Sequence, residues 1–282
     1  MSKNSTWPRI TIITPSYNQG EFIEETIKSI LNQDYPNLEY FIVDGGSTDN
    51  TLDIIRQYED RIDWWVSEPD RGQSHAINKG LARATGEIIN WINSDDLLFP
   101  GALSHIAEGY MPHAGEVALI SGALARISQE GKILRISCPP SPRAIFFKNL
   151  VMPVGQPSSF FTKKAIEAVG YLREDLHAIM DVDLFYKIFN NDGKLVRAKG
   201  IIGAIRNHEK AKTFAQKELW TNERPKYRSQ IGFVPLLNKI DLIKMRVIRI
   251  IDGSYLQSYF LTRYYANVIV DGNGILTNKP NI

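Results

Sequence analysis

Two adjacent carboxylates, Asp95 and Asp96, are the sharpest chemical feature of the sequence. They follow a predicted strand, 87–92, and are flanked by the apolar residues Trp91-Ile92 and Leu97-Leu98-Phe99. Carboxylates in apolar surroundings are costly unless a positive group meets them. A divalent cation carried by a diphosphate would do so, because hard cations choose oxygen ligands and bridge phosphate oxygens. The alternative is helix capping, since acidic residues ahead of Pro100 would suit the positive end of a helix.

Two turns earlier in the chain contain polar residues that could bind a nucleoside. Asp44 begins the tight turn 44–47, where its carboxylate can accept a hydrogen bond from a base imide or a ribose hydroxyl. Ordinary capping of the next helix, by Ser47, is the alternative. Tyr17 can stack on a base and Asn18 can hydrogen-bond to one, although a core position for Tyr17 is a competing interpretation.

Asp181 and His208, later in the chain, are a candidate general base and a candidate metal or phosphate ligand. Asp181 opens the segment Asp181-Val182-Asp183 at a predicted helix start, where it can act either as a cap or as a general base that takes a proton from a hydroxyl. His208 can bind a metal or a phosphate. The sequence alone does not place either residue near Asp95.

Apolar strands alternate with helical stripes four times within the first 111 residues. The expected strands are 10–14, 39–43, 62–66 and 87–92, and the expected helices are 21–31, 52–58, 74–84 and 100–110. This alternation predicts an α/β fold, with a mostly parallel central sheet flanked by helices. Open α/β sheets bind ligands at the carboxyl ends of their strands, so residues 16–18, 44, 68–71 and 95–96 should gather there.

The pattern loosens after Val117. We expect strands at 118–127, 132–136, 158–161, 195–198 and 201–205, and helices at 164–169 and 183–189. Residues 217–251 are expected to form a basic helix with an apolar stripe of Leu236, Leu237, Ile240, Ile243, Val247 and Ile251. The expected organisation is a catalytic-type domain over residues 1–215, followed by a basic helical extension over residues 216–282.

Composition and charge narrow the class of protein. The single cysteine, Cys138, excludes an intrachain disulfide, and no run of about 18 apolar residues predicts a membrane span. The polar start of the chain lacks the apolar core of a signal peptide, so we expect a cytoplasmic protein. From Lys199 onward there are 14 Lys/Arg against 6 Asp/Glu, whereas the first 198 residues have 19 against 25. The basic part could face anionic lipid or phosphate, or simply be a solvated face.

The sequence lacks the motifs of NAD-dependent enzymes, of P-loop nucleotide-binding proteins, of serine hydrolases and of zinc sites. The first strand–helix turn, 15–20, is not a glycine-rich dinucleotide loop, and the sequence has neither a Walker loop nor a Gly-x-Ser-x-Gly elbow. It also has no Cys/His cluster that would bind zinc.

Three segments in order, Ile10–Asn18, Val43–Asp49 and Asn93–Asp96, resemble the family 2 glycosyltransferases of GT-A fold. The resemblance covers roughly residues 9 to 210. Residues 68–80, 156–161 and 180–184 are similar to a bacterial branch of that family, which is associated with polysaccharide and surface-glycan assembly.

The resemblance implies a role for each matching residue on the donor side. Pro15, Tyr17 and Asn18 would line a nucleoside pocket, Asp44 would contact the base, and Arg71 would belong to the same nucleotide-sugar site.

On the metal side, Asp95 would contact the ribose or the metal, and Asp96 the metal. Asn93 stands at the first position of the family's Asp-x-Asp motif, so the metal site would have one carboxylate fewer. His208 matches a histidine that contacts the metal or the diphosphate. Asp181 falls on the position of the catalytic base, with Met180 where the family often has Glu.

The implied activity is an inverting, metal-dependent hexosyl transfer of class EC 2.4. The donor would be a UDP-, dTDP- or GDP-sugar, the cofactor Mn²⁺ or Mg²⁺, and the acceptor a glycan or a lipid-linked sugar, with no nucleic acid partner. A peripheral membrane contact through Lys239–Arg249 is one expectation for the basic segment, and packing of its apolar stripe on the catalytic domain is the other.

Two rival functions remain open at this point. A sugar nucleotidyltransferase should carry a basic, glycine-rich loop after its first strand, whereas residues 15–20 contain no Lys or Arg. A non-catalytic nucleotide- or glycan-binding relative would bind without turnover, and retention of Asp44, Asp95, Asp96 and Asp181 speaks against it.

Overall fold

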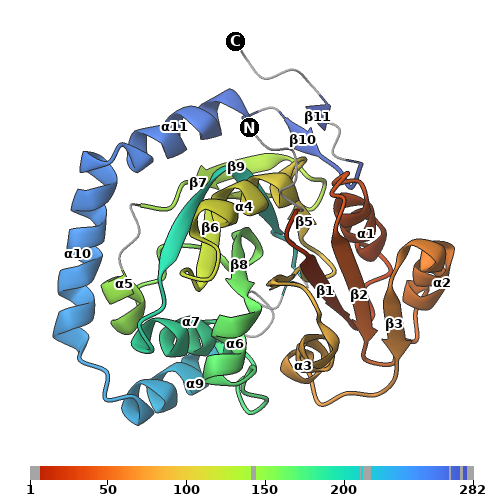
Figure 1. Cartoon of the computed structure of the whole chain (residues 1–282), viewed down its shortest axis with the longest axis horizontal. Coiled ribbons are helices and arrows are strands. Elements are labelled where there is room, and N and C mark those ends of the chain that lie inside the picture. Colours follow the sequence, from red (N-terminus) through yellow and green to blue (C-terminus); the bar gives the residue numbers. More distant parts are fainter. Residues whose placement is uncertain are drawn as a thin grey trace.

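The computed structural model describes residues 7–140, 144–209, 211, 217–266, 268–273 and 276–277. Its first half follows the predicted alternation of strands and helices (Figure 1). The strands are β1 (Ile10–Ser16), β2 (Leu38–Asp44), β3 (Trp64–Ser67) and β4 (Ile88–Trp91). The helices are α1 (Ile23–Leu31), α2 (Thr51–Gln57), α3 (Gln73–Arg83) and α4 (Ala102–Tyr110), with 3-10 turns at Glu59–Arg61 and Met111–His113.

The middle of the chain completes the sheet. Its strands are β5 (Leu97–Leu98), β6 (Leu119–Ile127), β7 (Ile133–Ser137), β8 (Ser159–Thr162) and β9 (Leu195–Arg206). Its helices are α5 (Ala144–Lys148), α6 (Lys163–Val169) and α7 (Met180–Asn190), with a 3-10 turn at Gln156–Ser158. The two short strands expected at 195–198 and 201–205 are one strand, β9, which bends at Gly200, where φ is +77°.

The sheet order is β3-β2-β1-β4-β8-β6-β9-β5, with β7 paired to β6. Strands β3, β2, β1 and β4 are parallel, as predicted for the first half. The second half is mixed, because β8 runs antiparallel to both of its neighbours while β6 and β9 are parallel.

Successive residues of β1 point to opposite faces of the sheet and enter different cores. Ile12 packs in a cluster with residues of α1, α2 and α4, whereas Ile13 packs with residues of α3, α6 and α7. Helices therefore cover both faces, and the carboxyl ends of the parallel strands stay open at one edge.

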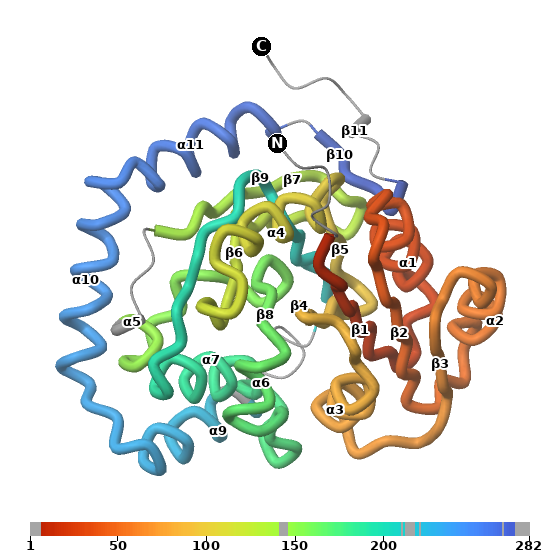
Figure 2. The backbone as a smooth tube through the Cα atoms, viewed as in Figure 1, coloured from red at the N-terminus to blue at the C-terminus, as the bar shows by residue number. Residues whose placement is uncertain are grey.

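The chain ends in three helices that follow one another around the outside of the sheet's second half (Figures 1 and 2). They are α9 (Lys217–Gln230), α10 (Pro235–Ile251) and α11 (Ser254–Tyr264), and a small hairpin of β10 (Ile269–Val270) and β11 (Leu276–Thr277) comes next. The expected single helix 217–251 is thus two helices. Gly232 at a φ of +64° and Pro235 at the first turn of α10 separate them. The expected boundary between residues 215 and 216 lies outside the described residues.

One of the two expectations for the basic segment is wrong. The stripe from Leu236 to Ile251 does not pack on the body of the protein, since its six side chains are between 37 and 79% exposed. Among the described residues, no helix is long and apolar enough to cross a membrane.

Candidate functional site

The carboxyl ends of three parallel strands lie side by side. The register pairs Ser16 of β1 with Asp44 of β2, and Asp44 with Ser67 of β3. The Ser16 hydroxyl is buried and has no hydrogen-bond partner among the described residues. A buried hydroxyl without a partner is rare in native structures, so this atom can serve a ligand at the sheet edge.

Asp44 is fully buried and holds the turn that follows it. One oxygen, Oδ2, accepts hydrogen bonds from the backbone N–H groups of Gly46 (3.0 Å) and Ser47 (2.8 Å) and from the Ser67 hydroxyl (2.7 Å). The Ser47 hydroxyl donates to Oδ1 at 2.5 Å. Gly46 has a φ of +87°, which favours glycine. Asp44 therefore shapes the turn, and the capping interpretation of Ser47 is replaced by this carboxylate–hydroxyl bond.

Tyr17 and Asn18 lie on the surface beside that turn. Tyr17 is 60% exposed, so its ring is not in the core. Asn18 joins the first two strand–helix loops, because its backbone N–H donates to Ser47 Oγ (2.7 Å) and its Oδ1 accepts from Thr48 N (2.9 Å). Pro15 is buried at the end of β1. The exposed Tyr17 ring thus stands on a rigid pair of loops.

Asp95 and His208 form a pair at the end of β4, although 113 residues separate them in the chain. Asp95 Oδ2 lies 2.9 Å from His208 Nε2. The imidazole is nearly buried against the Phe22 ring, with centroids 4.5 Å apart, whereas 19% of the Asp95 side chain is exposed. The pair therefore presents one carboxylate and one imidazole to the site.

Asp96 is more deeply buried than Asp95. It is 3% exposed, and its oxygens accept hydrogen bonds from the Arg206 backbone N–H (3.1 Å) and the Asn93 side-chain amide (3.1 Å). Burial raises the pKa of the Asp96 carboxyl well above its ordinary value, and the neighbouring Asp95 carboxylate adds to this rise. In this arrangement Asp96 is a buried part of the loop, and Asp95 is the more accessible carboxylate.

Arg206, at the end of β9, holds this loop and was not singled out by the sequence. Its Nε donates to the Asp95 carbonyl (3.1 Å), its Nη1 to the Gln129 carbonyl, and its Nη2 forms an ion pair with Glu25 at 2.5 Å. The signal was an arginine directly after the apolar run 201–205 and two residues before His208. A buried arginine almost always has charged or carbonyl partners.

Two contacts of α3 connect the Asp95 loop to the helix that carries Asp181. Gln73 Nε2 donates to Asn93 Oδ1 (2.6 Å), and the next residue, Ser74, lies with its hydroxyl 3.0 Å from Met180 Sδ. Asp181 follows Met180 in the first turn of α7, and its Oδ1 accepts from the Val182 N–H. The start of α3 thus contacts both segments.

A carboxylate of α9 holds the chain just ahead of α7. The two oxygens of Glu223 accept hydrogen bonds from the backbone N–H groups of His177 and Ala178, both at 2.8 Å. Asp183, by contrast, is buried and forms an ion pair with Lys187 one turn later in α7. The C-terminal helices therefore help to position the segment that leads into Asp181.

Arg71 lies on an exposed loop after β3. Its Nε and Nη2 donate to Glu174 Oε2 at 3.0 and 2.6 Å, and 68% of its side chain is exposed. An exposed pair of this kind contributes little to stability, so Arg71 can exchange Glu174 for an anionic ligand.

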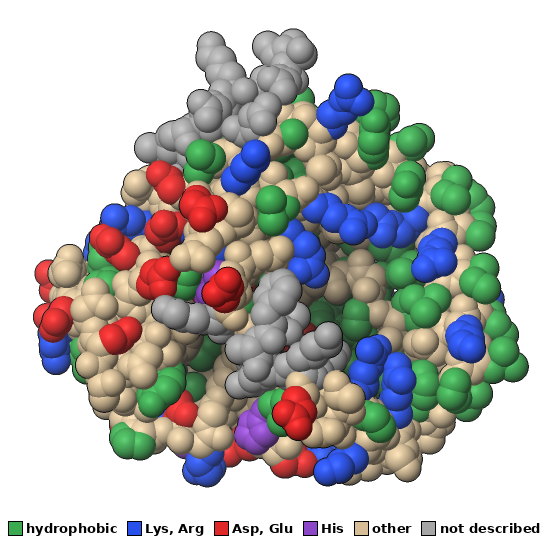
Figure 3. Space-filling view, turned by 180° about the vertical axis from the view of Figure 1, so that it is seen from behind, with side chains coloured by type: hydrophobic (Ala, Val, Ile, Leu, Met, Phe, Trp, Pro, Cys, Tyr) green, Lys and Arg blue, Asp and Glu red, His purple; other side chains and the backbone are tan. Residues whose placement is uncertain are grey.

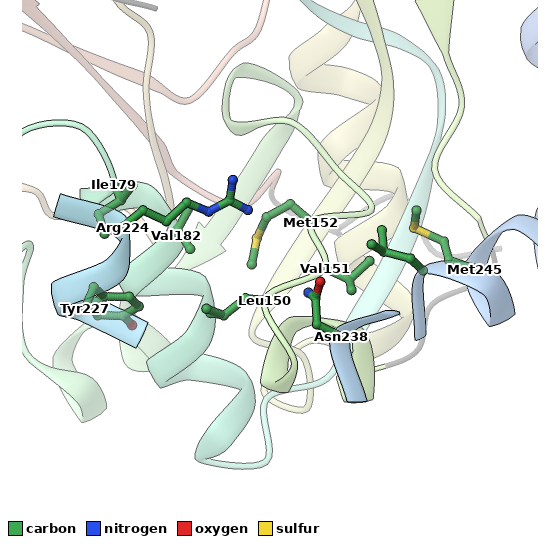
Figure 4. Close-up of a pocket in the computed structure, with 10 residues that line it drawn as sticks. Leu150, Val151, Met152, Ile179, Val182, Arg224, Tyr227, Asn238 and Met245 are labelled. Atoms are coloured by element: carbon green, nitrogen blue, oxygen red, sulfur yellow. The ribbon is translucent and has the colours of Figure 1, made fainter. Parts of the chain in front are cut away.

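A cavity of about 310 Å³ lies between α7, α9 and α10 (Figure 4). Its walls are largely apolar, and Ile179 and Val182 of the α7 region face α10 residues across it. Asp181 is not among the lining residues, so this cavity does not mark the place where a substrate would meet Asp181.

The donor set fits a cation that shares its ligands with a phosphate. Among the described residues, no group of three or more His, Cys, Asp or Glu side chains is arranged to hold a metal by itself. Asp95 and His208 would offer such a cation one oxygen and one nitrogen, and Mg²⁺-type sites with one or two carboxylates commonly take substrate phosphates as their other ligands.

Two curated relatives share parts of the sequence. An uncharacterized glycosyltransferase of Rickettsia conorii is 30% identical over 188 residues, 64% of this chain and 31% of that protein. The GalNAc(5)-diNAcBac-PP-undecaprenol beta-1,3-glucosyltransferase of Campylobacter jejuni is 34% identical over 111 residues, 36% of each chain. The chain thus spans about a third of the length of these relatives.

Solved structures share the fold. TarS residues 1–349 of S. aureus, in complex with UDP-GlcNAc, align with a TM-score of 0.54 at 20% identity, over 71% of this chain and 59% of that one. The mannosyltransferase PcManGT of Pyrobaculum calidifontis, in complex with GDP-Man and Mn²⁺, aligns with a TM-score of 0.55 at 24% identity, over 73% and 59%. The expected GT-A fold is confirmed.

The family model "Glycosyl transferase family 2" matches residues 11–166, which include the strand ends at Ser16, Asp44 and Ser67 and the Asp95 loop. This match favours sugar transfer over nucleotidyl transfer. The chain belongs to glycosyl transferase family 2.

Proposed function

We propose that the chain transfers a hexosyl group from a nucleoside-diphosphate sugar to an acceptor hydroxyl, with inversion, during assembly of a surface polysaccharide. The observation that carries this proposal is the Asp95–His208 pair at 2.9 Å, at the edge where the parallel strands end. The undecaprenol-linked glycan in the name of the Campylobacter relative supports a lipid-linked acceptor. The proposed site of action is the cytoplasm.

The nucleoside part of the donor is proposed to lie on the first two strand–helix loops. Tyr17 stacks on the base, and Pro15 and Asn18 hold the loop beneath it. Asp44 acts through the turn that it shapes, and the buried Ser16 hydroxyl gains a partner in the ligand. Arg71 leaves Glu174 and pairs with the diphosphate, a geometry that a guanidinium serves well.

Asp95 and His208 are proposed to hold a divalent cation, Mn²⁺ or Mg²⁺, together with the diphosphate. When bound, such a cation offsets negative charge on the departing nucleoside diphosphate. Asp96 supports Asp95 from the buried side of the loop. Its hydrogen bonds to Arg206 N and Asn93 fix the backbone on which Asp95 stands.

Asp181 is proposed to take the proton of the acceptor hydroxyl as its oxygen attacks C1 of the sugar. The bond between C1 and the diphosphate oxygen breaks, and its electron pair leaves with the nucleoside diphosphate. Attack opposite the leaving group turns an α-linked donor into a β-linked product. The first turn of α7 and the Glu223 contacts position Asp181 for this step.

Two variants separate binding from chemistry. With Mn²⁺ and a screen of nucleotide sugars, the matching donor should raise Tm, because a ligand at 100 times its Kd stabilises a protein by about 2.7 kcal/mol. Asp95→Asn should lose most of this shift. Asp181→Asn should keep the shift and lose turnover by roughly 10²–10⁴-fold, as expected for a general base.

The control is Asp192→Asn, which changes an exposed aspartate just after α7 and should leave both readouts unchanged. Near-wild-type transfer by Asp181→Asn would refute its role as base. A wild-type chain that binds donor without any turnover toward a panel of lipid-linked and glycan acceptors would point to a non-catalytic binder.

We also propose that residues 1–215 form the catalytic domain and residues 216–282 an extension that supports it through α9.

A further inference from the structure

Helix α10 hydrogen-bonds to the protein through polar residues, beside the half-buried Leu242 and Met245, and shows a longer row of apolar residues to solvent. Asp241 is 2% exposed and accepts a hydrogen bond from the Asn149 side chain, while Asn238 donates to the Asn149 carbonyl (2.7 Å). The exposed aliphatic side chains of this segment are Val234, Leu236, Leu237, Ile240, Ile243, Val247, Ile250 and Ile251. An ordinary surface helix turns its apolar stripe to the core, whereas most apolar side chains of α10 face solvent.

Helix α11 also has polar side chains on its inner face and apolar side chains toward solvent. Ser254, Ser258 and Thr262, spaced four residues apart, form its inner face. Ser258 Oγ and Thr262 Oγ1 accept hydrogen bonds from the backbone N–H groups of Cys138 and Ile136 next to and within β7, both at 2.9 Å. The outward side chains are Tyr255, Leu256, Tyr259, Phe260 and Tyr264. Hydroxyls thus attach the helix to the sheet edge, and aromatic rings face away.

The charges among these exposed residues have one sign. Lys239, Lys244, Arg246 and Arg263 are exposed, whereas the one acidic residue within the two helices, Asp241, is buried. Viewed from behind, Lys and Arg side chains alternate with hydrophobic ones on the right of the view, and most of the acidic side chains in the same view lie on the left (Figure 3).

We propose that the outward faces of α10 and α11, the α10–α11 belt, bind an anionic lipid bilayer and lie in its interface. Helices with an apolar face and flanking Lys/Arg bind in this manner, with aromatic residues at the headgroup level. Self-association through the same surface would bring rows of cations together, which is unfavourable. The proposal is independent of the chemistry at Asp95 and Asp181.

Flotation of the full chain with vesicles tests the proposal. The wild type should float with vesicles of equal parts phosphatidylcholine and phosphatidylglycerol, and less with pure phosphatidylcholine or in high salt, because salt screens surface charge. Ile243→Gln with Ile250→Gln and Phe260→Gln should reduce binding at least tenfold. Lys239→Gln with Arg246→Gln should reduce it by roughly fivefold per charge.

The matched control is Leu134→Gln with Lys164→Gln, which removes an exposed leucine and an exposed lysine outside the belt and should float like the wild type. All substituted side chains are exposed, and Tm checks that each variant folds. A wild type that stays with neither vesicle, or an apolar variant that floats like the wild type, overturns the proposal. So does a dimer, seen by sedimentation, that the apolar variant dissociates without any vesicle binding.

A label gives a second measurement that does not depend on the amount of protein bound. Cys138 is the single cysteine and is buried, so Ile243→Cys can be labelled selectively with an environment-sensitive fluorophore. Anionic vesicles should shift its emission to the blue, and a label at Leu134→Cys should not respond. Equal responses at both positions would contradict docking through the belt.

Discussion

Helices α1 and α10 are both rich in isoleucine, but they use it in opposite ways. In α1, Ile23, Ile27 and Ile30 are fully buried, and the helix covers one face of the sheet. In α10, Ile243 and Ile251 are 61 and 79% exposed, while Asp241 and Asn238 are hydrogen-bonded to Asn149. The same helical periodicity therefore serves the core in one region and an outer surface in the other.

The difference shows that an apolar stripe in the sequence predicts a helix with one apolar face. The stripe does not predict whether that face packs against the core of the same protein. Helix α1 and the first half of the sheet bury apolar side chains against one another within this chain. The helices α10 and α11 leave a row of apolar side chains exposed. Matched substitutions in the two regions should therefore have very different effects on the free energy of unfolding.

The largest contrast is expected between two arginines. Arg206→Met removes a buried guanidinium that binds Glu25 and the carbonyls of Asp95 and Gln129, and should cost about 3–5 kcal/mol in urea denaturation. Arg263→Met, on exposed α11, should change the free energy of unfolding by no more than about 0.5 kcal/mol. An equal loss in the free energy of unfolding for both variants would mean that Arg263 makes contacts as stabilising as those of Arg206.

The next contrast concerns a buried aliphatic side chain. Ile27→Ala should destabilise the protein by about 2–5 kcal/mol, because it removes buried methylenes and leaves a cavity between α1 and the sheet. The measurement is again urea denaturation, with an unchanged m-value. A cost below about 1 kcal/mol would show that the site collapses around the smaller side chain or is less tightly packed.

A smaller, pH-dependent effect is expected at Glu39 in β2. Burial raises the pKa of its carboxyl, but hydrogen bonds from Thr11 and Thr85 and the Arg9 charge outweigh it, and the pKa lies below the ordinary 4.5. A lowered pKa adds stability above pH 4.5 and loses it as the pH falls through the folded-state value. Glu39→Gln should therefore cost about 1–3 kcal/mol at pH 7 and less in acid. A difference in Tm that does not shrink below pH 4 would contradict this.

The sequence predicted the parallel half of the fold well because each element there is locally consistent. In β1 to β4, apolar runs end in turn residues, β2 pairs with its neighbours in sequence, β1 and β3, and β1 also pairs with β4. The gathering of Ser16, Asp44 and Ser67 follows directly from this parallel register.

Other parts of the site depend on long-range contacts that no local pattern contains. Arg206 meets Glu25 across 181 residues, and Asp95 meets His208 across 113. The sequence does not decide which of Asp95 and Asp96 is the main metal ligand. The two residues are adjacent, and only the folded loop determines which carboxylate is buried. The outward direction of the α10 stripe was equally undetermined, since periodicity is the same whichever side faces the body.

The smallest expected effect on the free energy of unfolding is at an exposed residue of α10. Ile243→Ala should change the free energy of unfolding by no more than about 0.5 kcal/mol, and in the stabilising direction, because alanine has the higher helix propensity and no buried contact is lost. The measurement is made in buffer, and then with anionic vesicles present. Wild type and Ile243→Ala should be alike in buffer, and only with vesicles should the wild type gain more thermal stability than the variant. A large loss in buffer alone would mean that Ile243 is covered by protein, and the contrast between α1 and α10 would then disappear.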